Sequence, residues 1–247
     1  MSVPANSKVI LEAQGIVKVL GTPPNDVKVL KGVDLELHTG ELTLMMGPSG
    51  SGKTTLLSIL GCILSPTEGR LRVAGMQTDT MSKEALANLR RKHVGFIFQS
   101  YNLVPTLTAA ENVMLALDLR DLRGPGAYEN AVEVLEQVGL SHRINAMPSK
   151  MSGGEKQRVS IARALAGSPS VILADEPTAA LDAKNGLAVM ELLAKVAQDT
   201  KRAVLAVTHD HRTLQFADRI IRIDDGRIAE SERPKLPGAK SLEMPAH

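Results

Sequence analysis

The 247-residue sequence contains few aromatic residues: three Phe, two Tyr and no Trp. Its core must therefore be built from aliphatic side chains and methionine, and few rings are available to stack on nucleic-acid bases. Cys62 is the only cysteine, which excludes an internal disulfide framework. Because Cys62 lies in an apolar segment, we expect a reduced, buried thiol and a cytoplasmic location.

The sequence also lacks a strong charge of one sign and a long apolar run. The 29 Lys plus Arg nearly balance the 27 Asp plus Glu, which is unlike the strongly basic surface of proteins that bind duplex nucleic acid. No apolar run approaches the eighteen or so residues that span a bilayer, and the N-terminus has no secretory pattern. These features predict a chain that is soluble by itself and has no nucleic-acid partner.

The most informative segment is 47–54, Gly-Pro-Ser-Gly-Ser-Gly-Lys-Thr, which follows the apolar run 42–46. Alone, such a segment could be an ordinary turn. An apolar strand before it and a helical pattern after it favour a phosphate-binding loop, in which backbone N–H groups face the phosphates of a nucleotide. Lys53 would then reach the β and γ phosphates, and the hydroxyl of Thr54 would bind Mg²⁺.

The pattern of apolar residues predicts an α/β fold. Alternation in 9–16 and 33–37 indicates antiparallel strands. Five nearly continuous apolar segments, separated by helical patterns, predict a parallel core sheet covered on both faces: 42–46, 94–98, 171–174, 203–207 and 220–223. Residues 99–166 read as a helical insert, and 231–247, with three prolines and little periodicity, as a loosely held tail.

Two further groups of residues are candidates for binding or catalysis. Asp175 and Glu176 follow an apolar strand, where ligands gather in parallel sheets, so Asp175 fits a Mg²⁺ partner and Glu176 could polarise an attacking water. The alternative is a solvated strand end. Ser152-Gly153-Gly154 begins a second glycine-rich helix, which is either a second anion site or an ordinary capped helix.

Taken together, these motifs resemble the ATP-binding subunit of ABC transporters. The loop at 47–54, Met-Ser-Gly-Gly-Glu-Lys-Gln-Arg at 151–158, Leu-Ala-Asp-Glu-Pro-Thr-Ala-Ala-Leu-Asp at 173–182 and Val-Thr-His-Asp at 207–210 occur in the family's order. The segments 95–103 and 108–113 are similar to the branch that serves macrolide export, lipoprotein release and heterocyst glycolipid export. The resemblance implies a single ATPase domain over 1–230, with a core (1–98 and 167–230) that includes an antiparallel β part, and a helical subdomain (99–166).

The resemblance also implies roles for individual residues. Glu176 would be the general base, His209 would hold the γ phosphate, and Gln99 would sense Mg²⁺ and the attacking water. Ser152, Gly153 and Gly154 would contact the nucleotide held by a second copy of the chain, and Asp182 would link the two sites. The remaining nucleotide contacts would come from Gly47, Pro48, Ser49, Gly50, Ser51, Gly52, Lys53, Thr54 and Thr55.

Two residues depart from the family's pattern. Leu20 stands where an aromatic residue often stacks on adenine, so it would give apolar contact without ring overlap. Glu155 stands where Gln is usual and adds negative charge near the phosphate-facing glycines.

The expected cofactors are ATP and Mg²⁺. The expected partners are a second copy and an integral membrane permease with a periplasmic adaptor, at the cytoplasmic face of the inner membrane. The sequence leaves open a different role, in which the ATPase transmits force to cell-wall hydrolases during division. ATPases that act on DNA or ribosomes are disfavoured, because residues 99–151 hold no long heptad insert.

Overall fold

The computed structural model describes residues 7–234. The predicted tail therefore lies largely outside the described residues, but strand β10 (Arg227–Glu232) extends two residues past the expected end of the domain at 230. The prediction stopped early because β10 is polar and mostly exposed, and so shows no apolar pattern. Within 7–234, no helix is long and apolar enough to cross a bilayer.

The larger sheet has the strand order β10-β9-β3-β8-β7-β6. Its strands from β9 to β6 pair in parallel, and β10 pairs antiparallel with β9 at one edge. The parallel strands are β3 (Leu42–Met46), β6 (Val94–Ile97), β7 (Val171–Asp175), β8 (Ala203–Val207) and β9 (Arg219–Asp224). This is the parallel core sheet that the apolar segments predict.

Side chains of the central strands alternate between two hydrophobic clusters, one on each face of the sheet. Leu44 of β3 and Ile172 of β7 belong to the cluster beneath the helical part of the molecule. Met45 and Leu173, one residue further along each strand, belong to the cluster under the antiparallel sheet. Since β3 and β8 are fully buried over their whole length, both faces are covered.

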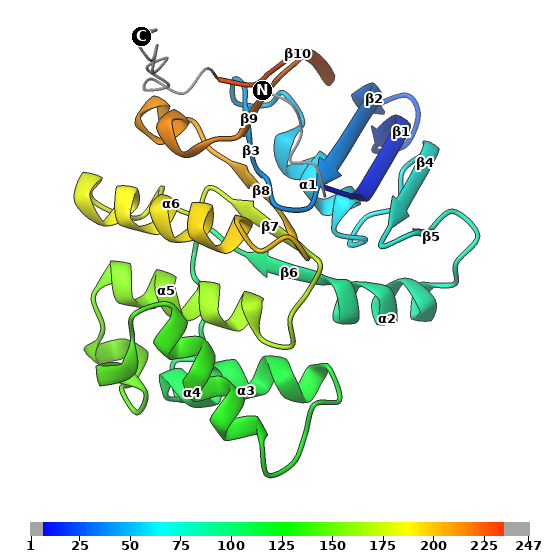
Figure 1. The fold of residues 1–247 in the computed structure, drawn as a ribbon. Helices are drawn as coiled ribbons and strands as arrows, with labels where there is room; N and C mark the ends of the chain where they lie inside the picture. Colours follow the sequence, from blue (N-terminus) through cyan, green and yellow to red (C-terminus); the bar gives the residue numbers. More distant parts are fainter. Residues whose placement is uncertain (1–6, 235–247) are drawn as a thin grey trace, which may run out of the picture.

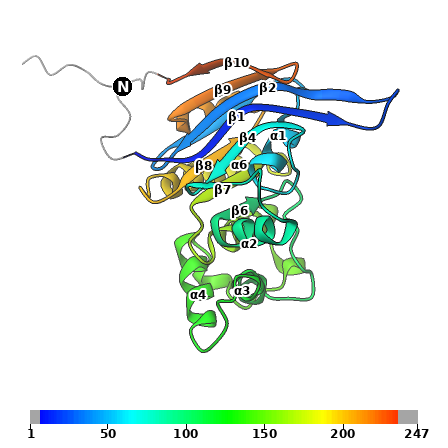
Figure 2. The same ribbon diagram turned by 90° about the vertical axis from the view of Figure 1, so that its right-hand side faces the viewer.

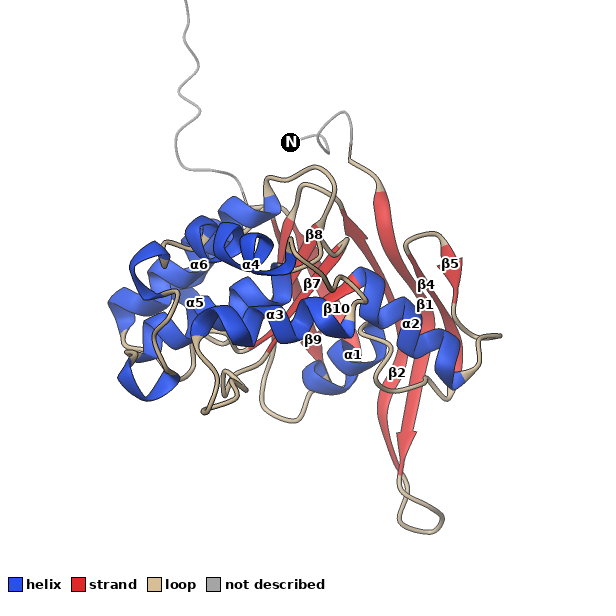
Figure 3. Cartoon of the chain, turned by 90° about the horizontal axis from the view of Figure 1, so that it is seen from below, coloured by secondary structure: helices blue, strands red, loops and turns tan. Residues whose placement is uncertain are grey.

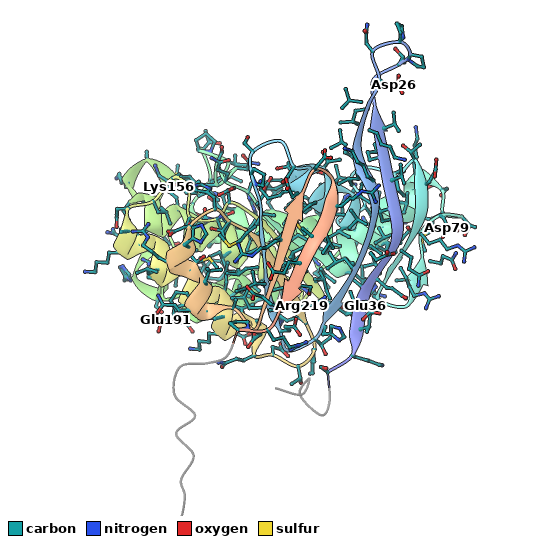
Figure 4. The ribbon with its side chains drawn as sticks, turned by 90° about the horizontal axis from the view of Figure 1, so that it is seen from above. Asp26, Glu36, Asp79, Lys156, Glu191 and Arg219 are labelled. Carbon is teal, nitrogen blue, oxygen red and sulfur yellow. The ribbon has the colours of Figure 1, made fainter. Side chains whose placement is uncertain are left out.

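A second sheet is antiparallel, with the order β2-β1-β4-β5. Its strands are β1 (Val9–Leu20), β2 (Val27–His38), β4 (Glu68–Val73) and the two-residue β5 (Met76–Gln77), which is too short for a sequence pattern. The hairpin of β1 and β2 projects from the body of the molecule (Figure 2), and Asp26 lies in the loop at its tip (Figure 4).

Helices cover both faces of the core sheet, and those of the helical part group below it (Figure 1). In the view from below, the helices of the helical part lie to one side of the antiparallel strands (Figure 3). The α-helices are α1 (Lys53–Leu60), α2 (Lys83–His93), α3 (Ala109–Leu119), α4 (Ala127–Gln137), α5 (Gly153–Leu165) and α6 (Ala183–Ala197). Short 3₁₀ turns are η1 (Ser141–Arg143), η2 (Pro148–Lys150) and η3 (His211–Phe216).

Capping residues explain where several helices begin. Thr108 and Glu111 form a capping box at the start of α3, with the N–H of Thr108 donating to the Glu111 carboxylate at 2.7 Å. α6 begins at Ala183, because Asp182 accepts the N–H of Asn185 at 3.0 Å. Helix starts of this kind depend on caps rather than on periodicity.

Close packing of α5 on β6 generates a test of the fold. A Cβ at Gly95 of β6 would lie 2.2 Å from the carbonyl oxygen of Ala164 in α5, so Gly95→Ala must push the helix away from the sheet. We expect it to lower the free energy of unfolding by about 1–3 kcal/mol, measured by denaturant titration.

Gly126→Ala is the matched control, because among the described residues a Cβ there would meet no atom within 4 Å. It should change the free energy of unfolding by less than about 0.5 kcal/mol. Equal stability of the two variants would contradict this packing.

Candidate nucleotide-binding site

The predicted functional segments follow the carboxyl ends of adjacent strands. The loop 47–52 follows β3, His209 follows β8, Glu176 follows β7 and Gln99 follows β6. Because these strands are neighbours in the order β3-β8-β7-β6, their carboxyl ends meet at one edge of the sheet. This is the edge where ligands bind in parallel α/β sheets.

The loop 47–52 requires glycine at two positions for steric reasons. A Cβ at Gly47 would lie 2.0 Å from the carbonyl oxygen of Ile223 in β9. Gly52 has a φ of 97°, which favours glycine, and a Cβ there would lie 2.8 Å from the Leu30 side chain. The backbone therefore passes close to its neighbours and turns directly into α1.

α1 begins at Lys53, directly after the loop, and has no side-chain cap. Its first backbone N–H groups, which lack intrahelical partners as in any α-helix, therefore have no side-chain acceptor from the N-cap residue either. These groups and the helix dipole favour an anion. The ammonium of Lys53 donates to the carbonyl oxygens of Gly47 (2.8 Å) and Pro48 (2.7 Å), which holds its charge over the same loop. The arrangement is that of a phosphate-binding loop.

A cavity of about 510 Å³ opens beside this loop, a size typical of small-molecule sites. Its lining gathers ten of the predicted residues from four segments of the chain, and one residue that sequence reasoning missed, Val29 of β2. The predicted lining residues are Gly47, Ser49, Gly50, Gly52, Lys53, Thr54, Thr55, Gln99, Glu176 and His209.

Three residues predicted to contact the nucleotide of the same chain stand apart from the cavity lining, as does Asp175, the predicted metal ligand. Leu20 lies at the end of β1 and is 41% exposed. Pro48 is exposed on the loop, and Ser51 is buried beneath it, with a hydroxyl that has no hydrogen-bond partner among the described residues. Val29 adds an apolar surface to the cavity, and no aromatic side chain of residues 7–234 lines it.

The residues predicted to bind a metal offer the oxygen ligands that Mg²⁺ prefers. The hydroxyl of Thr54 lies 3.5 Å from Oδ1 of Asp175, and Gln99 lines the same cavity. Burial raises the pKa of the Asp175 carboxyl, and the charge of Glu176 adds to this rise. Mg²⁺ is commonly held by one or two protein oxygens together with phosphate oxygens, so these residues fit the ion.

Glu176 adopts a left-handed backbone conformation, with φ of 50°. Such a conformation is uncommon for a non-glycine residue and is often found at functional sites. Oε2 of Glu176 lies 2.8 Å from Nδ1 of His209, a contact between charges when the imidazole is protonated, although it lacks hydrogen-bond geometry. The His209 side chain is 71% exposed, so it has room to turn toward a ligand in the cavity.

The second set of predicted residues gathers at another place on the chain. Ser152 is exposed at the start of α5, and a Cβ at Gly153 would approach both the Tyr101 hydroxyl and the Leu181 side chain. A Cβ at Gly154 would lie 2.8 Å from Oδ1 of Asn185, whose side chain donates to Asp182. The glycine-rich helix start and the Asp182 turn therefore form one surface, and neither lines the cavity of the same chain.

The fold and this site define a nucleotide-binding P-loop protein, and comparison with known proteins specifies its family. A family profile described as ABC transporter matches residues 30–179, more than half of the chain. The uncharacterized ABC transporter ATP-binding protein MJ0796 of Methanocaldococcus jannaschii is 40% identical over 228 residues, which cover 91% of this chain and 97% of that protein. The chain therefore belongs to the ABC transporter family, as an ATP-binding cassette and ATPase.

A solved structure and a second relative support the same family assignment. A structure titled as a dimeric, post-hydrolysis state of the ATP-binding cassette MJ0796 bound to ADP and Pi superimposes with a TM-score of 0.81 and covers 90% of this chain and 98% of that one. The macrolide export ATP-binding/permease protein MacB 1 of Aeromonas hydrophila is 45% identical over 224 residues. These cover 91% of this chain but 34% of that protein, so the chain spans about a third of that relative's length. The predicted family and ABC-ATPase fold are confirmed.

The position of Lys53 generates a test of the site. Lys53→Ala removes charge-assisted hydrogen bonds to the phosphates, so the dissociation constant for ATP should rise by about 10- to 100-fold, measured by calorimetry. Lys201→Ala, at the opposite end of the sheet before β8, should leave it unchanged. Unaltered affinity in the Lys53 variant would rule out the assigned phosphate loop.

Proposed function

We propose that two copies of this chain close on two ATP molecules and that this closure drives export through a membrane permease. The observation that carries the proposal is the division of the site. One cavity gathers Lys53, Glu176 and His209, whereas the exposed Ser152 lies outside it on the same chain. The dimeric state named for MJ0796 supports pairing of two copies, so that Ser152 of one copy can reach the nucleotide of the other.

The chemistry follows from the residues around the cavity. Lys53 and the N-terminus of α1 bind the phosphates, and Thr54, Gln99 and Asp175 would hold Mg²⁺. When bound, Mg²⁺ neutralises charge on the β and γ phosphates. Glu176 accepts a proton from water as the water oxygen attacks the γ phosphorus, and the bond to the β–γ bridging oxygen breaks. His209 turns from Glu176 to hold a γ-phosphate oxygen.

The proposed role of the second copy has a physical reason. The cavity leaves the γ phosphate open to bulk water on one side, where electrostatic stabilisation is weak. The donors at the start of the partner's α5 would cover that side upon closure and exclude water. Asp182, on the same surface as Ser152, would then lie between the two nucleotides and couple them.

A groove in the helical part of the molecule provides a surface for the permease. A cavity of about 430 Å³ lies between α2, β6, α3 and α5, with apolar walls that include Phe96 and Leu119. Leu119 is 61% exposed, and two further leucines of this region, Leu115 and Leu122, are also exposed. Exposed leucines beside a groove with apolar walls favour a protein contact.

The charge of this groove indicates the chemistry of the occupant. Three guanidinium groups at the groove donate to backbone carbonyl oxygens: Arg90 to Cys62, Arg120 to Val94 and Arg163 to Tyr101. Carbonyl oxygens satisfy the donors without neutralising their charge, so the groove is electropositive. We propose that it holds an amphipathic cytoplasmic helix of the permease with acidic residues, which would place the chain at the cytoplasmic face of the membrane. An extracytoplasmic adaptor belongs to the same proposal, because the MacB relatives are named for export.

Removal of the proposed base tests the paired mechanism. Glu176→Gln should lower turnover by at least about 100-fold, because the amide cannot accept the proton. It should still bind ATP, and a dimer should appear in sizing chromatography with ATP but not with ADP. A monomer that hydrolyses ATP at the normal rate would contradict both the base and the pairing.

Site-specific photocrosslinking tests the groove. A photoreactive side chain at position 119 should crosslink, in membranes that contain the native partners, to a peptide from a protein with membrane-spanning helices, and sequencing should show acidic residues in that peptide. The control position is Glu191, exposed on α6 (Figure 4). Equal crosslinking at both positions, or a crosslinked peptide without acidic residues, would contradict the assignment.

A further inference from the structure

The start of α5 is a complete capping box that leaves a defined set of hydrogen-bond donors free. The N–H of Ser152 donates to Oε2 of Glu155 at 2.8 Å, and the N–H of Glu155 donates to the hydroxyl oxygen of Ser152 at 3.2 Å. The Ser152 oxygen is therefore an acceptor within the box, and its own proton is free to point outward. Together with the first N–H groups of the helix, at Gly153 and Gly154, this gives three donors for an anion.

The same capping box places a negative charge, the carboxylate of Glu155, beside the donors that would bind a negatively charged phosphate. The Glu155 side chain is only 11% exposed. The hydrogen bond from the Ser152 N–H, opposed by burial and aided by Arg143, lowers the pKa of the Glu155 carboxyl to about 2, so this group is ionised at neutral pH. A carboxylate within the first turn of α5 repels the phosphate that the three donors would attract. An uncompensated Glu155 would work against the proposed contact.

Arg143 of η1 compensates this charge. Its Nε lies 2.7 Å from Oε1 of Glu155, the oxygen that is not used by the Ser152 N–H. Arginine stays protonated at all ordinary pH values, so the pair is permanently neutral overall. His142 lies 3.8 Å from the same oxygen, but its side chain is 64% exposed. The two carboxylate oxygens of Glu155 therefore serve two functions: one closes the capping box, and the other binds a cation.

We propose that Arg143 is a positioning residue for the contact between the α5 N-terminus and the γ phosphate held by the partner copy. It neutralises Glu155, so that the capping box can keep its geometry while the donors of Ser152, Gly153 and Gly154 retain a net attraction for phosphate. This inference rests on the proposed closure of two copies. It adds a residue from outside the glycine-rich segment, on a separate turn of the helical part.

The experiment measures ATP-dependent dimer formation in the Glu176→Gln protein, with and without Arg143→Ala. We expect Arg143→Ala to raise the ATP concentration for half-maximal dimer formation by about 5- to 30-fold, the range for a partly buried charge near a helix end. ATP affinity of the single chain, measured by calorimetry under dilute conditions, should stay the same, because the cavity lining does not include Arg143. With Glu176 intact, kcat should fall in the Arg143 variant.

A charge-removal background separates this role from a structural one. In the Glu155→Gln background, where the amide oxygen can still accept the Ser152 N–H but carries no charge, Arg143→Ala should shift dimer formation by less than about twofold. The matched control is Arg123→Ala, which removes the same charge from an exposed ion pair with Asp118 (3.7 Å) in the helical part and should have no effect.

Two outcomes would overturn the inference: Arg143→Ala without effect on dimer formation, or an effect of equal size with Glu155 present and in the Glu155→Gln background. Failure of the parent Glu176→Gln protein to form a dimer with ATP is a separate result, which would refute the proposed function itself.

Discussion

The register of four parallel strands is the constraint on which the site depends. Ile97, Ala174, Ala206 and Leu44 lie in one row across β6, β7, β8 and β3. Because of this alignment, the four strands end at the same edge of the sheet, and the residues that follow them meet around one cavity. A shift of one residue in any strand would send its alternate side chains into the wrong hydrophobic cluster, so burial of the core and assembly of the site are enforced together.

The same packing explains why the chain holds two incomplete halves of a site. The phosphate loop needs the sheet edge, with β9 so close that only glycine fits at position 47. The glycine-rich start of α5 belongs instead to the helical part, where it contacts the Asp182 turn through Asn185. One rigid chain therefore presents its phosphate loop and its second group of donors as separate surfaces. Two copies offer a direct way to bring unlike surfaces together around each nucleotide.

Much of this organisation could be predicted from the sequence, because strong local patterns carry it. The phosphate loop, the Asp175–Glu176 strand end and the start of α5 each combine an apolar run with glycine or capping residues. Val29 could not be found, because it looks like any residue of an alternating strand and reaches the cavity only through tertiary packing of β2. The ion pair of Arg143 and Glu155 could not be predicted from the sequence for a similar reason. Nothing in the spacing of these residues indicates that η1 turns back onto α5.

In the proposed dimer, a triphosphate bound at Lys53 of one copy is contacted by Ser152 of the other. A crystal structure of the protein with Mg²⁺ and a non-hydrolysable ATP analogue tests this most directly. We expect the γ phosphate to lie about 3 Å from both Nζ of Lys53 and the Ser152 hydroxyl of the second copy. Analogue bound elsewhere, or two copies joined with Ser152 facing away from the phosphate, would contradict it.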